Sequence, residues 1–92
     1  MILSFTCKDT QALFTDGNNR KWSQIANVAT RRLTALSEAV ELRDLRSPPG
    51  NRLELLEGKR KGQHSIRIND QWRICFEWTP QGPANVEIVD YH

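Results

Sequence analysis

The feature that most constrains this chain is a change in the spacing of its apolar residues at a proline-rich break. Before Ser47-Pro48-Pro49-Gly50, apolar side chains recur every three to four residues from Trp22 through Leu33 to Val40, as in an amphipathic helix. After the break the spacing becomes two, which is typical of β-strands. Because proline lacks an amide hydrogen and restricts its neighbours, the break must end the helical part. The helices are therefore expected before the break and most of the strands after it.

The helical part predicts two helices. Asp9 or Thr10 could cap a short helix over residues 11–14, which would end near Gly17. Ser23 is a plausible cap for the longer helix that carries the apolar stripe. The charged residues off this stripe are expected to face water.

The remaining segments predict a small, mainly antiparallel sheet. Its first strand is expected at Ile2–Cys7, where Leu3, Phe5 and Cys7 alternate with Ile2, Ser4 and Thr6. Two helices packed on one face of this sheet, in the order β-α-α-β-β-β-β, would make residues 1–92 a single α+β domain. The other face of the sheet must then meet solvent or a ligand. The further strands are expected near Leu53–Leu56, His64–Ile68, Trp72–Trp78 and Val86–Ile88.

One hairpin has a register that the apolar pattern determines. Ile66 and Ile68 must share the core face with Trp72 and Ile74. A three-residue turn over residues 69–71 pairs Ile68 with Trp72 and Ile66 with Ile74. The same register places an arginine opposite an arginine on the other face.

Arg67 and Arg73 are this pair, and like charges directly opposite each other destabilise a sheet. A nearby carboxylate, Glu54 or Glu77, could offset the repulsion, or a bound phosphate could do so. We favour phosphate because residues 59–73 hold five basic residues and one acidic residue, whereas the whole chain has a net charge of only +2. The expected RNA-binding residues around the hairpin are Lys59, Arg60, Lys61, His64 and Glu54.

The sequence ends in Asp90-Tyr91-His92, directly after the last expected strand. His92 can donate or accept a proton near neutral pH, and Tyr91 can stack on a base or transfer a proton. Strand alternation would place Tyr91 on one face and Asp90 and His92 on the other. The alternative is an inert tail with Tyr91 packed on the core. His64 could line the same groove, although a lone histidine is more often a surface residue.

RNA cleavage needs a base for the 2′-hydroxyl, a cation for the transition state and an acid for the leaving oxygen. Arg67 and Arg73 suit the second role, and the terminal residues or a carboxylate suit the others. No cofactor or metal is expected, since Cys7, Cys75 and two histidines are scattered along the chain. The absence of a leader-like start and of a long apolar run predicts a soluble cytoplasmic protein without a membrane partner.

Over nearly all of its length the chain resembles the HigB toxins of bacterial type II toxin–antitoxin pairs, within the RelE/ParE superfamily. The subgroup it is most similar to is the plasmid-maintenance killer proteins. The resemblance implies a RelE-like fold and a metal-independent, ribosome-dependent endonuclease that inhibits translation by cutting mRNA in the A site. It also implies a cognate HigA-like helix-turn-helix antitoxin. The motifs that carry it are Met1–Phe5, Gly62–Ile74 and Asp90-Tyr91-His92.

The resemblance also implies roles for individual residues. Some HigB toxins have His and Lys on the second strand, where this chain has Glu54 and Glu57, so the general base stays open and Glu54 is a candidate. Two other functions share this fold, namely a ParE-like inhibitor of DNA gyrase that does not catalyse, and an RNA-binding inhibitor that blocks the A site without cleavage. The expected catalytic residues are Arg73, Asp90, Tyr91, His92 and Arg67.

Overall fold

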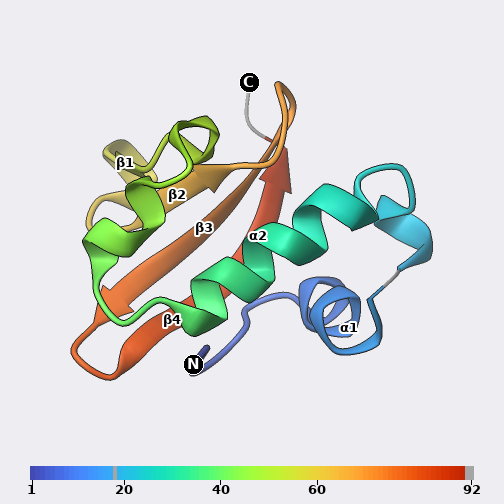
Figure 1. The fold of residues 1–92 in the computed structure, drawn as a ribbon, viewed down its shortest axis with the longest axis horizontal. Coiled ribbons are helices and arrows are strands. Elements are labelled where there is room, and N and C mark those ends of the chain that lie inside the picture. The colour runs from blue at the N-terminus through green and yellow to red at the C-terminus, as the bar shows by residue number, and fades with distance from the viewer. Residues whose placement is uncertain (18, 91–92) are drawn as a thin grey trace.

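Helices cover one face of a four-stranded sheet, with the helices in the first half of the chain and the strands in the second (Figure 1). The computed structural model describes residues 1–17 and 19–90. The four strands pair antiparallel in the order β1-β2-β3-β4, which confirms the predicted α+β class. The elements are α1 Lys8–Asp16, α2 Ala26–Glu38, β1 Glu54–Leu55, β2 His64–Arg67, β3 Trp72–Thr79 and β4 Gly82–Asp90.

The first helix, α1, is longer than expected and begins differently. It starts after Cys7, whose side chain makes no capping hydrogen bond, so the prediction of a cap at Asp9 or Thr10 is wrong. Thr10 is instead fully buried, and its hydroxyl oxygen accepts a hydrogen bond from the amide of Ile88, 3.1 Å away. This bond docks α1 on β4. The predicted end is confirmed, because Gly17 has a positive φ of 77° and its amide donates to the carbonyl of Leu13.

The second helix, α2, is shorter than the apolar stripe predicts. It begins after Ile25 without a side-chain cap, so Ser23 does not cap it. It ends at an extended Ala39, and Val40 beyond it is 84% exposed rather than part of the core. The chain then makes a separate 3-10 helix at Leu42–Arg46. Within residues 1–17 and 19–90, no helix is both long and apolar enough to cross a membrane.

A capping box begins this separate turn. One carboxylate oxygen of Asp44 accepts hydrogen bonds from the amides of Val40 and Glu41, at 3.0 and 2.9 Å. These two backbone bonds lower the pKa of Asp44 below its usual value. The turn is therefore stabilised by hydrogen bonds of its own, independently of α2.

The segment Ile2–Cys7 is not a full strand, so that prediction is wrong in part. Only Phe5 forms a bridge, parallel to Val86 of β4. Asn85 has a positive φ of 53°, and its amide donates to the hydroxyl of Ser4 instead of to a backbone carbonyl. This irregularity interrupts regular pairing, because a strand needs extended backbone on both sides.

The predicted hairpin register is confirmed. β2 and β3 pair Ile66 with Ile74 and Arg67 with Arg73. The apolar side chains of this face are buried under the helices and make the core. Fully buried members include Leu13, Ala29, Leu33, Leu36, Ile66, Ile74, Phe76 and Val86.

The opposite face of the sheet is partly covered, contrary to the expectation that it meets only solvent or a ligand. Ser65 and Cys75 are fully buried there, and Arg73 is only 7% exposed. The connection between β1 and β2 lies over this face, and Arg60 from it reaches Glu87 of β4. The β1–β2 connection thus buries the polar residues at the centre of this face.

The core predicts the outcome of a truncation. Leu33→Ala removes a fully buried side chain and should lower the free energy of unfolding by about 2–5 kcal/mol. Val40→Ala, at an 84% exposed position nearby in sequence, is the matched control and should change it by less than about 0.5 kcal/mol. Urea unfolding followed by tryptophan fluorescence measures both, and equal losses would contradict the assigned core.

Candidate functional site

The paired arginines on the outer face each have a carboxylate partner. Arg67 forms an ion pair with Asp70 of the turn, and a guanidinium nitrogen of Arg73 lies 3.8 Å from a carboxylate oxygen of Glu54. Glu77 accepts instead from the side-chain amide of Asn85. Charge repulsion across the hairpin is therefore offset within the protein. The carboxylate alternative therefore applies to Arg73 through Glu54, whereas the binding of a phosphate here stays a prediction.

The side chain of Arg73 is held in one orientation. Its Nε donates to the hydroxyl of Ser65 at 2.7 Å, and one terminal nitrogen donates to the backbone carbonyl of Arg52, also at 2.7 Å. Sequence reasoning missed Ser65, although the predicted register already placed it diagonally across from Arg73 on the same face. A guanidinium fixed in this way needs little reorganisation to bind an anion.

Glu54 lies at the open side of this cation. It pairs with Ser65 across β1 and β2, and its side chain is 52% exposed. The carboxylate is therefore close to Arg73 and also accessible to a substrate. A carboxylate in this place can accept a proton from a hydroxyl group bound beside the guanidinium.

Asp90 lies at the same end of the sheet as the arginines but faces the other way. It pairs with Trp72, whereas Arg73 pairs with Val89, so alternation places the Asp90 side chain on the face opposite to Arg73. One of its carboxylate oxygens accepts from the Gln71 side chain at 3.2 Å. This contact joins the end of β4 to the β2–β3 turn. Figure 1 shows these two segments side by side. Tyr91 and His92 lie outside the described residues.

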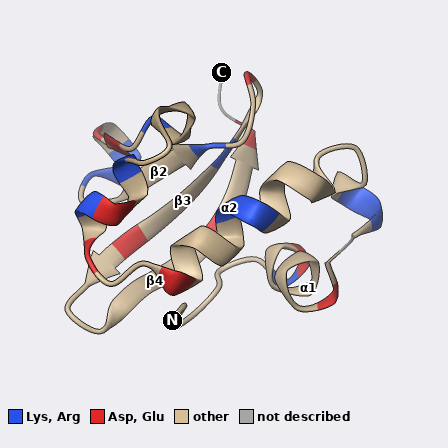
Figure 2. Ribbon diagram, in the orientation of Figure 1, with Lys and Arg blue, Asp and Glu red and all other residues tan. Residues whose placement is uncertain are grey.

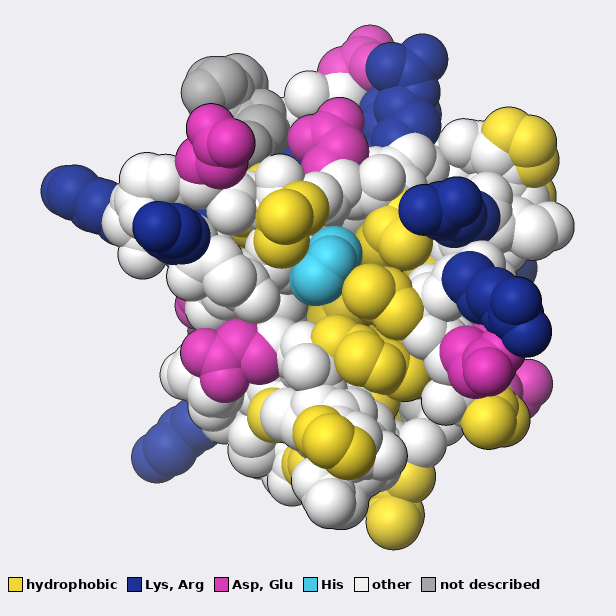
Figure 3. Space-filling model, turned by 90° about the vertical axis from the view of Figure 1, so that its left-hand side faces the viewer, with side chains coloured by type: hydrophobic (Ala, Val, Ile, Leu, Met, Phe, Trp, Pro, Cys, Tyr) yellow, Lys and Arg dark blue, Asp and Glu magenta, His cyan; other side chains and the backbone are white. Residues whose placement is uncertain are grey.

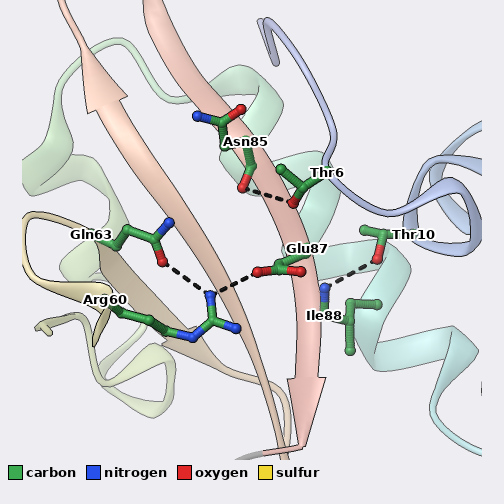
Figure 4. A network of polar contacts seen from close by, with 7 residues as sticks. All are labelled: Thr6, Thr10, Arg60, Gln63, Asn85, Glu87 and Ile88. Atoms are coloured by element: carbon green, nitrogen blue, oxygen red, sulfur yellow. Dashed lines mark hydrogen bonds and ion pairs between the residues drawn. The ribbon is translucent and has the colours of Figure 1, made fainter. Parts of the chain in front are cut away.

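The basic segment at residues 59–61 divides into two kinds of residue. Arg60 donates to a Glu87 carboxylate oxygen at 2.7 Å and to the side-chain oxygen of Gln63 at 3.1 Å (Figure 4). The main role of Arg60 is therefore to hold the β1–β2 connection against β4 through this ion pair. Lys59 and Lys61 are exposed. Only these two lysines present the segment's charge fully to solvent, which the sequence did not distinguish.

Cys75 lies on the outer face of the sheet near Arg60 and is fully buried. Burial raises the pKa of its thiol, which keeps the group protonated and non-nucleophilic at neutral pH. Cys7 and Cys75 are both free. Among the described residues, no group of three or more His, Cys, Asp or Glu side chains is placed to hold a metal ion.

His64 is on the helix-covered side of the sheet, so the prediction that it lines the arginine groove is wrong. It pairs with Phe76, with the two rings stacked at 6.2 Å between centroids. Its parity is that of Ile66 and not that of Arg67, because alternate residues of a strand face opposite sides. Burial lowers the pKa of this imidazole, and its buried Nδ1 has no hydrogen-bond partner among the described residues.

The charges of the outer face gather at one end of the sheet. Figure 2 shows basic segments where β2 ends and β3 begins, beside the acidic end of β4. Arg67 keeps 31% of its side chain exposed at this end. The outer face thus combines a fixed, nearly buried cation, a partly exposed cation and an accessible carboxylate. This set suits the binding of a phosphodiester and a proton transfer beside it.

Comparisons with known proteins cover nearly the whole chain. A profile of the family described as "RelE-like toxin of type II toxin-antitoxin system HigB" matches residues 3–92. The chain is 42% identical over 94 residues to the Vibrio cholerae protein named Toxin HigB-1, covering 100% of this chain and 98% of that protein. An uncharacterized protein of Haemophilus influenzae is 40% identical over 63 residues, which are 68% of this chain and 62% of that relative.

The Ser65 contact predicts a cost for removing one hydroxyl. Ser65→Ala leaves the Nε of a buried arginine without that acceptor, so the free energy of unfolding should fall by about 1–3 kcal/mol. Ser23→Ala, at an exposed serine, is the control and should be nearly neutral. Chemical denaturation measures both, and a neutral Ser65→Ala would show that Arg73 is held without this bond.

The His64 site predicts a pH dependence of stability. Its pKa is lowered in the folded protein, so the unfolded chain binds more protons as the pH falls below the ordinary value of 6.5. The free energy of unfolding should therefore decrease from about pH 7.5 to pH 5.5. His64→Phe should reduce this decrease, whereas His92→Gln, at the second of two histidines, should keep it. Thermal melts across this range measure the effect, and an unchanged slope in His64→Phe would refute it.

Proposed function

Because the chain belongs to the HigB-like family, the RelE-like toxins of type II toxin–antitoxin systems, we propose that it is an endoribonuclease that cuts mRNA in the ribosomal A site. The observation that carries the proposal is the fixed guanidinium of Arg73, with the Glu54 carboxylate 3.8 Å away. Such a cation can stabilise the extra negative charge of a five-coordinate phosphorus.

The chemistry follows from this placement. A base takes the proton of a 2′-hydroxyl, the resulting oxygen bonds to the adjacent phosphorus, and the bond from phosphorus to the 5′-oxygen breaks. An acid gives a proton to that 5′-oxygen, so the products are a 2′,3′-cyclic phosphate and a 5′-hydroxyl. We assign the base to Glu54, because it is accessible beside the cation. We assign the acid to His92 or Tyr91, whose side chains can donate a proton.

The basic residues around Arg73 would bind the mRNA and the ribosomal RNA. Lys59 and Lys61 are exposed and free to follow phosphates, and Arg67 can exchange its exposed Asp70 partner for a phosphate. Arg60 would contribute through its ion pair with Glu87, which keeps the β1–β2 connection and its two lysines in place. Asp90 would act by fixing the β2–β3 turn through Gln71 and would not touch the phosphate. This division changes the roles that the sequence indicated for both residues.

The proposal predicts that each of three single substitutions slows mRNA cleavage. Arg73→Lys, Glu54→Gln and His92→Gln should each lower the rate of mRNA cleavage by roughly 10²–10⁴-fold, because each removes one part of the reaction. The measurement is primer extension on mRNA bound to purified ribosomes, with circular dichroism to show that the fold is kept. Arg31→Gln, at an exposed arginine on the far, helical side of the sheet, is the matched control and should cleave normally.

Other results would favour the two other functions. Intact message on stalled ribosomes would mean that the protein blocks the A site without cleavage. Intact message with normal translation and inhibited DNA gyrase would indicate the ParE-like activity. Full cleavage by Arg73→Lys and Glu54→Gln together would refute the assigned mechanism.

A further inference from the structure

A pocket opens on the side of the sheet that does not carry Arg73. Its volume is about 360 Å³. Figure 3 shows a histidine side chain at this face, next to a cluster of hydrophobic side chains with basic side chains at the rim. The proposed nuclease chemistry uses none of the side chains in this pocket. The pocket is lined by Leu42, Arg43, Arg46, Leu53, Leu55 and His64.

The floor of this pocket includes an exposed apolar side chain. Leu55 is 65% exposed, one of the most exposed large hydrophobic residues of the described chain. It lies on β1, which is two residues long and forms an outer edge of the sheet. Together with the half-buried Leu42 and Leu53 of the same pocket, Leu55 forms an apolar patch beside a strand edge, a kind of surface that another protein can cover.

The rim of the pocket carries two arginines, of which Arg43 has an acidic partner and Arg46 has none among the described residues. Arg46 is exposed and makes no hydrogen bond or ion pair with any described residue. Arg43 contacts Glu41 at 2.7 Å, but both side chains are more than half exposed, so this pair is weak. The capping box at Asp44 fixes the turn that presents both arginines. An apolar floor with a cationic rim complements an apolar side chain flanked by carboxylates.

We propose that this pocket, defined by the six lining residues above, is a docking site for the cognate antitoxin. The occupant would be a segment that inserts one apolar side chain over Leu55 and places carboxylates at Arg43 and Arg46. The inference rests on the proposed function only in that a toxin of this family has an antitoxin partner. RNA fits less well, because phosphates gain nothing from an apolar floor. A second copy of this chain also fits less well, because a twofold contact would bring the same arginines together.

The experiment compares two pocket variants with a matched control. Leu55→Ala and Arg46→Glu should each raise the Kd for the purified cognate antitoxin at least tenfold, measured by calorimetry, since buried apolar anchors and paired arginines dominate such interfaces. Arg31→Glu makes the same charge change on the exposed side of α2, outside the pocket, and should leave the Kd unchanged. In cells without antitoxin, all three variants should inhibit growth as the unaltered toxin does. Coexpressed antitoxin should fail to rescue growth only with the pocket variants.

Three results would overturn the proposal. An unchanged Kd in the Leu55→Ala, Arg46→Glu double variant would show that the antitoxin binds elsewhere. Lost growth inhibition and ribosome binding with an unchanged Kd would assign the pocket to RNA. A toxin that is dimeric alone and becomes monomeric on Leu55→Ala, with an unchanged Kd, would assign it to self-association. If the unaltered toxin failed to cleave mRNA while the pocket variants still escaped the antitoxin, only the proposed nuclease function would fail.

Discussion

The burial of one positive charge organises this structure. The guanidinium of Arg73 is almost removed from water, and a buried charge is tolerated only when its hydrogen bonds are satisfied. Ser65 and the carbonyl of Arg52 supply these bonds, and Glu54 supplies the nearby negative charge. Those three groups come from β2, from the segment before β1 and from β1 itself. The short β1 strand and its connection must therefore lie beside β2, which also creates the accessible edge of the candidate site.

The pleat of the sheet then separates two kinds of chemistry. Along β2, Ser65 and Arg67 face the polar side, whereas His64 and Ile66 face the helices. The first side carries cations and a carboxylate, the groups that the proposed cleavage of a phosphodiester would use. The second side ends in a pocket between the 3-10 helix Leu42–Arg46 and the edge of the sheet. One strand thus contributes to two surfaces that a substrate and a protein partner could use separately, because adjacent side chains point away from each other.

Patterns that arise from local physics were predictable from the sequence. The register of the hairpin follows from placing Ile66 and Ile74 on one face, and the left-handed end of α1 follows from Gly17. Contacts between distant segments were not predictable. Arg60 resembles its neighbouring lysines in the sequence, and only the fold brings it to Glu87, 27 residues later. Val40 continues an apolar stripe, yet the capping box at Asp44 starts a new turn and leaves it exposed.

The sequence by itself determined the class of fold, the pairing of Arg67 with Arg73, and the resemblance to HigB-like toxins. These features depend on residue spacing, which strand and helix geometry translate directly into faces. Only the tertiary structure decided which arginine is fixed, which carboxylate accompanies it, and that His64 belongs to a different surface. Those outcomes depend on how the β1–β2 connection crosses the sheet. A contact between residues far apart in the chain is set by packing, which no local pattern encodes.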